Sequence, residues 1–173
     1  WTPDRLVTGT LERQRDTLSA MGYDGDAEVH AGFDEYDFHD LLKARYKGVV
    51  PEMVSSDRKT HFRTLRDTVL EWQAGTLTGC AETYAEFSER TAAAMAHATR
   101  DGARQVLVVS SGGVIGQLVS RALEAPARMM MELNLQIKNT AVTKFVFSGT
   151  RHFVHQFNAT PHFDTDHDLL TYS

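Results

Sequence analysis

The chain has one cysteine, Cys80, among its 173 residues. A single cysteine cannot form a disulfide within the chain, so we expect a reducing, cytoplasmic setting. Long apolar runs are missing as well, because stretches such as residues 106–109 (VLVV) are far too short to cross a bilayer. The opening residues 1–5 (WTPDR) do not have the basic-then-apolar pattern of a secretory signal. We therefore expect neither a membrane span nor a secretory signal in this sequence.

Positive charge is not in excess. The chain carries 18 Lys and Arg against 23 Asp and Glu, a formal net charge of −5. A general binder of nucleic acid or of acidic membranes needs a basic field, so we expect neither as a partner. An anionic partner would have to be a small molecule that a local group of cations binds. The apolar fraction of 42% and the charged fraction of 24% are ordinary for one soluble globular domain.

Strand-like and helix-like patterns alternate along the chain. Strands are predicted at residues 5–8, 28–33, 105–109, 140–147 and 152–157, the last two as a hairpin. A helix is expected after the first strand, with Thr10 as its N-cap. Residues 40–100 have helical apolar spacing, interrupted at 75–79. This order predicts an α/β fold, a three-layer α/β/α sandwich with a mainly parallel sheet, in which roughly residues 40–100 form a helical cap inserted in a single domain of residues 1–173.

One predicted strand-to-helix loop has the composition of a phosphate site. Ligands of open α/β sheets lie beyond the carboxyl ends of the strands, and residues 110–113 (SSGG) follow such an end. Glycines let the backbone approach a ligand, and the N-terminus of the next helix offers free N–H groups and a partial positive charge. The alternative is a plain tight turn.

Two charged side chains lie in segments of the same kind. Arg13 falls in the first helical turn after the first strand, where a guanidinium can reach back and bind phosphate through two hydrogen bonds. Glu35 lies among aromatic residues in 33–38 (FDEYDF), where a carboxyl can have a raised pKa and act as a general acid. Taken alone, each segment favours the plainer interpretation: a solvated surface arginine, and a capping or loop carboxylate.

In their order and spacing these segments resemble the histidine phosphatase superfamily, whose fold is phosphoglycerate-mutase-like. In that family an arginine follows the second core strand in a small-x-Leu-x-Arg-x-x-x-Thr pattern. Residues 10–17 (TLERQRDT) are similar to it, with Arg13 in the phosphate-binding place. Residues 33–38 look like the family's general-acid segment, with Glu35 as the acid, although His39 stands where glycine is usual.

The later part of the chain extends the resemblance. Residues 109–115 (VSSGGVI) are similar to a strand end that reads Val-Ser-His-Gly-Gly-Val-Ile, and residues 139–143 and 158–163 resemble the closing hairpin. Ser111 stands in place of the family's second active-site histidine. A hydroxyl is shorter than imidazole and neutral, and losing one electrostatic donor of this kind lowers the rate on the order of 10²–10³-fold.

The resemblance implies hydrolysis of a small phosphorylated substrate through a phosphohistidine intermediate, without metal or cofactor. Arg13 would bind the phosphoryl oxygens, Glu35 would protonate the leaving group, and Ser111 with the Gly112 N–H would complete the pocket. The family's nucleophile belongs to an Arg-His-Gly motif on the first strand, which does not occur in these 173 residues. We expect that motif in a segment preceding Trp1.

Several alternatives stay open. The protein could be a phosphatase weakened or inactivated at Ser111, an enzyme mutated there to trap its substrate, or a non-catalytic module that binds phosphate or a phosphosugar; a mutase is less favoured. A serine hydrolase using Ser111 would need a Gly-x-Ser-x-Gly turn, and Val109 stands where its first glycine belongs. The acidic and histidine residues near the C-terminus lack compact metal-ligand spacing, so we interpret them as a solvated tail and expect no metal: His162, Asp164, Asp166, His167 and Asp168.

Overall fold

A computed structural model describes residues 2–23, 25, 27–52, 54, 57–163 and 167–172 of the chain. The chain divides into two compact units. We name them the sheet unit, Trp1–Glu35 with Arg90–Ser173, and the helical unit, Tyr36–Glu89. Within the described part, no helix is both long enough and apolar enough to cross a membrane.

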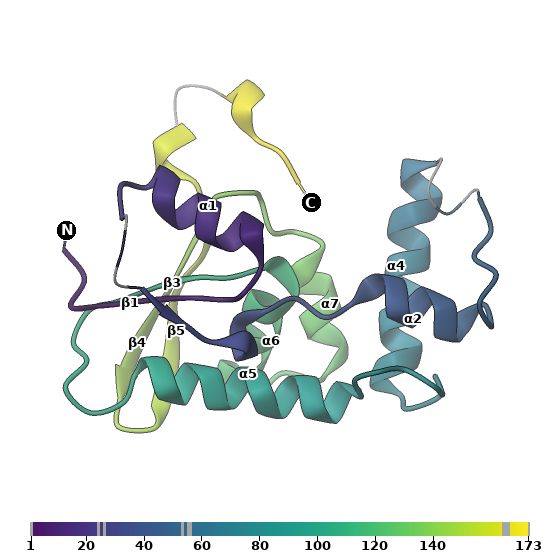
Figure 1. Cartoon of the computed structure of the whole chain (residues 1–173), viewed down its shortest axis with the longest axis horizontal. Helices are drawn as coiled ribbons and strands as arrows, with labels where there is room; N and C mark the ends of the chain where they lie inside the picture. The colour runs from purple at the N-terminus through teal and green to yellow at the C-terminus, as the bar shows by residue number, and fades with distance from the viewer. Residues whose placement is uncertain are drawn as a thin grey trace. The chain divides into compact units, whose positions relative to one another are not determined.

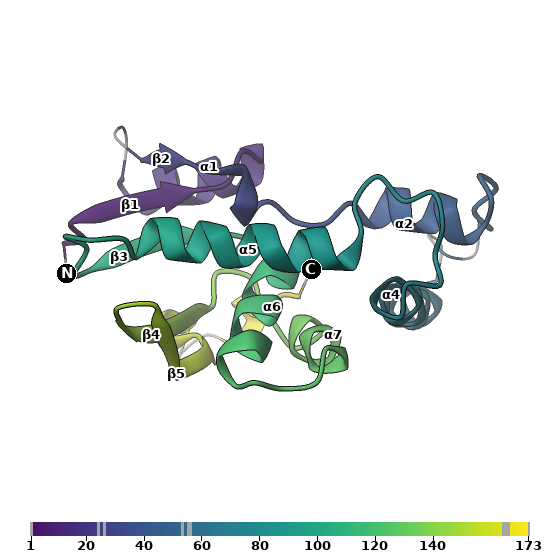
Figure 2. The same cartoon turned by 90° about the horizontal axis from the view of Figure 1, so that it is seen from below.

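A parallel sheet of three strands organises the sheet unit (Figure 1). Its strands, in the order β2-β1-β3, are β2 Glu28–Val29, β1 Arg5–Thr8 and β3 Val106–Val109. Figures 1 and 2 show α1 (Glu12–Ala20) on one side of this sheet and the end of α5 (Tyr84–Ala98) on the other. Val7 in the central strand is fully buried, as a strand covered on both faces requires. The predicted α/β sandwich with a mainly parallel sheet is confirmed.

The start of α1 differs from the prediction. Its N-cap residue is Leu11, which makes no side-chain capping bond. Thr10 lies one residue before this cap position, where its N–H and hydroxyl both donate to the carboxylate of Asp34, at 2.6 and 2.5 Å. At the other end, Gly22 follows the helix with a φ of +82°, the left-handed conformation that commonly ends helices.

The strand predicted at residues 28–33 is shorter than expected. After β2 the chain turns into a 3₁₀ helix, Ala31–Phe33, and the His30 ring accepts a hydrogen bond of 3.0 Å from the Gly32 N–H. A Cβ on Gly32 would lie 2.6 Å from the Ala94 side chain and 2.7 Å from the Arg90 carbonyl oxygen. The turn therefore packs directly on α5 instead of continuing the sheet.

The remaining elements of the sheet unit follow the predicted order. β3 leads into α6 (Gly112–Ala122) and then α7 (Arg128–Asn134). The two helices approach closely, because a Cβ on Gly116 would lie 2.7 Å from the Met130 carbonyl oxygen. The predicted hairpin is confirmed as the antiparallel pair β4 (Val142–Ser148) and β5 (Arg151–Ala159).

The helical unit contains α2 (Phe38–Arg45), α4 (Arg58–Gln73) and the first residues of α5. Asp57 caps α4 by accepting from the Thr60 N–H at 2.7 Å. Trp72, which is 3% exposed, packs against the rings of Tyr36 and Phe87, with centroids 5.5 and 5.4 Å away. The predicted helical spacing around Trp72 is therefore confirmed. That this unit is a cap inserted in one domain stays a prediction.

Candidate functional site

The three parallel strands end at the same level. Thr8 is in register with Val29 on one side and with Val109 on the other. The segments that leave these ends carry the three side chains singled out in the sequence, which are Arg13, Glu35 and Ser111. The register of the sheet therefore brings distant parts of the chain to one edge, which we call the carboxyl edge.

Arg13 and Ser111 are in direct contact, although 98 residues separate them. Arg13 Nη2 donates a hydrogen bond of 3.3 Å to Ser111 Oγ. Arg13 is exposed and Ser111 is 9% exposed, so the guanidinium extends from the surface to a buried hydroxyl. A guanidinium has five N–H donors, and within the described residues this is the one side-chain hydrogen bond that Arg13 makes. Its other donors have no acceptor among the residues that the structure describes.

Glu35 reaches the first turn of α6. The Gly113 N–H donates a hydrogen bond of 2.8 Å to Glu35 Oε2. N–H groups in a first helical turn have no acceptor within the helix and favour a negative partner. Ser111 is the N-cap residue of the same helix, so Glu35 and Ser111 share one helix terminus. The contact agrees with the capping interpretation of Glu35, and its role as an acid stays a prediction.

Gly112 has a packing role that its sequence motif did not reveal. A Cβ at this position would lie 2.6 Å from Asn134 Oδ1. The absence of a side chain therefore lets α7 approach the start of α6. At the start of α6 the N–H that donates to Glu35 belongs to Gly113, the residue after Gly112. Phosphate binding by the Gly112 N–H stays a prediction.

Two residues that the sequence did not single out hold the segment before Glu35. The Asp34 carboxylate accepts from Thr10 and so joins the segments that follow β2 and β1. Arg90 Nη1 donates to the carbonyl oxygens of Asp34 at 2.8 Å and Gly32 at 3.2 Å. A charged residue in a helical pattern normally indicates a solvated face, so no sequence signal pointed to Arg90.

Gln14 is a third residue that sequence reasoning missed. It is 2% exposed, and its Nε2 donates to Ser111 Oγ and to the Phe33 carbonyl oxygen, both at 2.9 Å. Its Oε1 is buried and has no hydrogen-bond partner among the described residues. A signal was present, because position 14 falls on the apolar stripe of α1 between Leu11 and Leu18. A polar residue on such a face must find partners inside.

The serine hydrolase alternative finds no support in the geometry around Ser111. Its backbone has a φ of −111° and a ψ of 165°, which is ordinary extended chain and not a strained turn. In the described part of the chain its hydroxyl contacts Arg13 and Gln14, and no histidine base. The neighbouring Ser110 donates its hydroxyl proton to the Phe33 carbonyl oxygen at 2.8 Å.

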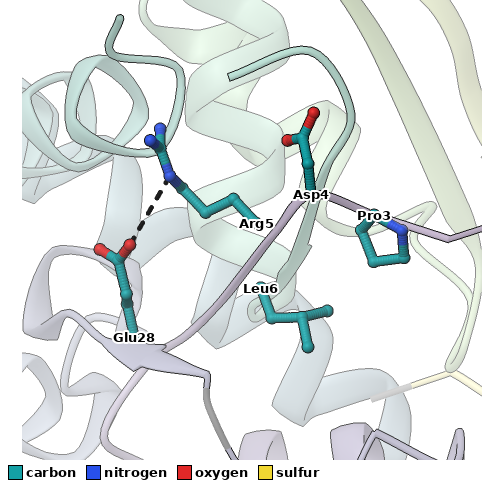
Figure 3. Close-up of a pocket in the computed structure, with 5 residues that line it drawn as sticks. All are labelled: Pro3, Asp4, Arg5, Leu6 and Glu28. Atoms are coloured by element: carbon teal, nitrogen blue, oxygen red, sulfur yellow. Dashed lines mark ion pairs between the residues drawn. The ribbon is translucent and has the colours of Figure 1, made fainter. Parts of the chain in front are cut away.

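A hollow of about 390 Å³ lies at the other end of β1, lined by Pro3, Asp4, Arg5, Leu6 and Glu28 (Figure 3). Its charged groups bind one another and the backbone. Arg5 pairs with Glu28 at 3.6 Å and donates to the Ala98 carbonyl oxygen at 2.8 Å. The Asp4 carboxylate accepts from the backbone N–H groups of residues 104 and 105. These contacts give the hollow a structural explanation.

Metal ligands do not cluster in the described residues, where no group of three or more His, Cys, Asp or Glu side chains could hold an ion. Of the C-terminal residues named above, Asp164 and Asp166 lie outside the described part. The His162 ring lies 3.0 Å from Thr140 Oγ1, a contact between polar side chains at the surface.

Comparison with known families gives one match over nearly the whole chain. The family described as the histidine phosphatase superfamily (branch 1) matches residues 1–160. No curated protein matches the chain.

Three solved structures with this arrangement are 17–19% identical to the chain. A phosphoserine phosphatase mutant from Entamoeba histolytica, in complex with phosphoserine, has a TM-score of 0.62 at 19% identity, covering 92% of this chain and 76% of that one. The alpha-ribazole phosphatase from Shigella flexneri has a TM-score of 0.63 at 17% identity, with coverages of 91% and 74%. A phosphoglycerate mutase from Bacillus anthracis has a TM-score of 0.57 at 19% identity, with coverages of 91% and 73%. The fold is therefore phosphoglycerate-mutase-like.

Proposed function

Because this chain belongs to the histidine phosphatase superfamily, we propose that it acts on small phosphomonoesters at the carboxyl edge of its sheet. The observation that carries the proposal is the convergence of Arg13, Ser111 and Glu35 on the N-terminus of α6. A guanidinium, a hydroxyl and helix N–H groups are donors suited to the oxygens of a phosphoryl group. The single cysteine is compatible with the cytoplasm as the place of action.

The proposed reaction is a metal-independent hydrolysis in two steps. A histidine nitrogen attacks phosphorus, the bond from phosphorus to the ester oxygen breaks, and Glu35 gives its proton to that oxygen. Water then attacks the phosphohistidine and gives a proton back to the Glu35 carboxylate, the phosphorus–nitrogen bond breaks, and inorganic phosphate leaves. Arg13 and Ser111 hold the phosphoryl oxygens in both steps, with the Gly112 N–H beside them. The nucleophile would come from an Arg-His-Gly segment that precedes Trp1.

Ser111 sets the expected rate of this reaction. A neutral hydroxyl stabilises developing negative charge less than a histidine donor, and the loss of one such donor lowers turnover on the order of 10²–10³-fold. We therefore propose a slow phosphatase.

The second candidate is a module that binds phosphate or a phosphosugar without turnover. The observation that favours it is the burial of Ser111, whose hydroxyl accepts a hydrogen bond from the buried Gln14 and so forms part of the packed interior.

Measurements on the complete natural protein separate the candidates. Intact-mass analysis and N-terminal sequencing should reveal Arg-His-Gly before Trp1. Hydrolysis of an aryl phosphate should be slow but above background, and vanadate should inhibit it. Vanadate binding without turnover would favour the binding module, and labelling of Ser111 by a fluorophosphonate would favour a serine hydrolase. A protein that neither binds vanadate nor hydrolyses the ester contradicts both phosphate proposals.

A further inference from the structure

The hydrogen bonds of Gln14 fix the orientation of its amide. The Phe33 carbonyl oxygen can accept a hydrogen bond but cannot donate one, so the group 2.9 Å from it must be the amide nitrogen Nε2. The same nitrogen lies 2.9 Å from Ser111 Oγ, and an NH₂ group has two protons, one for each acceptor. Gln14 therefore donates to Ser111.

Ser111 Oγ is an acceptor twice over. It receives one hydrogen bond from Gln14 Nε2 and a second from Arg13 Nη2, at 2.9 and 3.3 Å. A hydroxyl oxygen has two lone pairs and one proton. With both lone pairs occupied, the hydroxyl interacts with any further partner through its proton. Among the residues that the structure describes, no acceptor for that proton is found.

We propose that Gln14 is a positioning residue that holds the Ser111 hydroxyl as a hydrogen-bond donor towards a phosphoryl oxygen. This inference rests on the proposed function of the site. Phosphoryl oxygens of a dianionic phosphomonoester accept hydrogen bonds and donate none, so they match a hydroxyl whose proton is its one free group. The pair Gln14–Ser111 thus presents one neutral donor beside the Arg13 guanidinium.

A purely structural role explains the amide less well. Gln14 Oε1 is buried and has no partner among the described residues, which is unfavourable for folding. The Phe33 carbonyl oxygen also receives the Ser110 hydroxyl at 2.8 Å, so it keeps a hydrogen bond when Gln14 is replaced. An apolar side chain of similar length at position 14 would therefore fold at least as well. The bond to Ser111 is what such a replacement removes.

The test is calorimetric titration of the complete protein with orthovanadate, for wild type and Gln14→Leu. Gln14→Leu should weaken vanadate binding roughly three- to tenfold, the usual range for one hydrogen bond, while the melting temperature stays equal or rises. Gln117→Leu serves as the matched control, because Gln117 is also buried, at 5% exposure, but takes no part in the two hydrogen bonds to the Ser111 hydroxyl. It should leave vanadate affinity unchanged.

A double-mutant cycle separates positioning from packing. If Gln14 acts through the Ser111 hydroxyl, Gln14→Leu has no further effect on vanadate binding once Ser111→Ala is present. An equal loss in both backgrounds, or no loss in the single variant, overturns the inference while leaving phosphate binding by wild type intact. A wild type that does not bind vanadate contradicts the proposed function itself and the inference with it.

Discussion

The two ends of β1 carry similar side chains that are paired in different ways. At the amino end, Glu28 receives hydrogen bonds from Arg100 at 2.7 Å and His97 at 2.8 Å, and it pairs with Arg5. Arg5 also donates to the Ala98 carbonyl oxygen. The charged side chains named here therefore all have partners within the protein.

At the carboxyl end the Glu35 carboxylate accepts from the Gly113 N–H, but the donors around Ser111 are not all paired. Arg13 and Gln14 both donate to Ser111, whose own proton finds no acceptor in the described part of the chain. An arginine beside a carboxylate therefore does not identify a binding site. Donors that converge on a hydroxyl whose own proton has no acceptor among the described residues indicate where an anion would be favoured.

The largest expected effect comes from restoring the histidine donor at the carboxyl end. Ser111→His in the complete protein should raise the turnover of an aryl phosphate by roughly 10²–10³. The gain should appear mainly in kcat, because the donor acts on charge that develops during transfer. Steady-state kinetics and melting temperatures of both proteins provide the measurement.

The limited space around position 111 makes a second variant necessary, because a histidine is larger than the serine it replaces. Ser111 is 9% exposed and is in contact with Gln14, so an imidazole there could displace the amide. Ser111→His with Gln14→Ala makes room for the ring. Background turnover in both variants, with their folds intact and Arg-His-Gly present, would defeat the catalytic proposal and leave the binding module.

A smaller effect is expected from Arg13→Lys. A point charge replaces a two-pronged donor, so phosphate and vanadate should bind about tenfold more weakly. The melting temperature should barely change, because Arg13 is exposed. Arg15→Lys, on an exposed position of the same helix, is the control that should change neither property. Unchanged vanadate affinity in Arg13→Lys would return Arg13 to the role of a solvated surface residue.

The sequence predicted the parts of this comparison that depend on local pattern. Apolar β-branched residues gave the position of β3, and helical spacing located α4 and α5. The convergence of Arg13 and Ser111 followed from a resemblance, and the parallel register of β1 and β3 provides its physical cause.

What the sequence did not predict depends on contacts between distant segments. Thr10 is of a residue type that favours an N-cap, but the helix begins one residue later, and Thr10 instead binds Asp34, which lies 24 residues away in the sequence. The hydrogen bonds from Arg90 to the segment before Glu35 span 56 and 58 residues, and nothing near Arg90 signals them. Gln14 was detectable as a polar residue on an apolar face, but the sequence did not show that its partner is Ser111, 97 residues away.

The smallest effect concerns the amino end and tests the other half of the comparison. The hydrogen bonds from Arg100 and then His97 hold the pKa of Glu28 at about 2, below its ordinary 4.5. The Glu28 side chain is 37% exposed, so solvent screening reduces the contribution of this network to about 1 kcal/mol. Glu28→Gln should lower the free energy of unfolding by about that amount at pH 7. Because the proposed phosphate site lies at the carboxyl edge and not at the amino end, the affinity of Glu28→Gln for vanadate should stay as in wild type.

The stability lost in Glu28→Gln depends on pH in a direction that follows from the lowered pKa of Glu28. A carboxyl with a depressed pKa stabilises the fold at pH values above its unfolded pKa, and the contribution disappears as the pH falls through its folded pKa. The stability difference between wild type and Glu28→Gln should therefore be full above about pH 4.5 and shrink towards pH 2. Denaturant unfolding at several pH values measures it, with Glu124→Gln as a control at an exposed glutamate. A difference that does not vary with pH would mean that the pairing at the amino end contributes nothing to stability. Weakened vanadate binding in Glu28→Gln would instead show that the two ends of β1 are energetically coupled, against the independence that their separate hydrogen-bond networks predict.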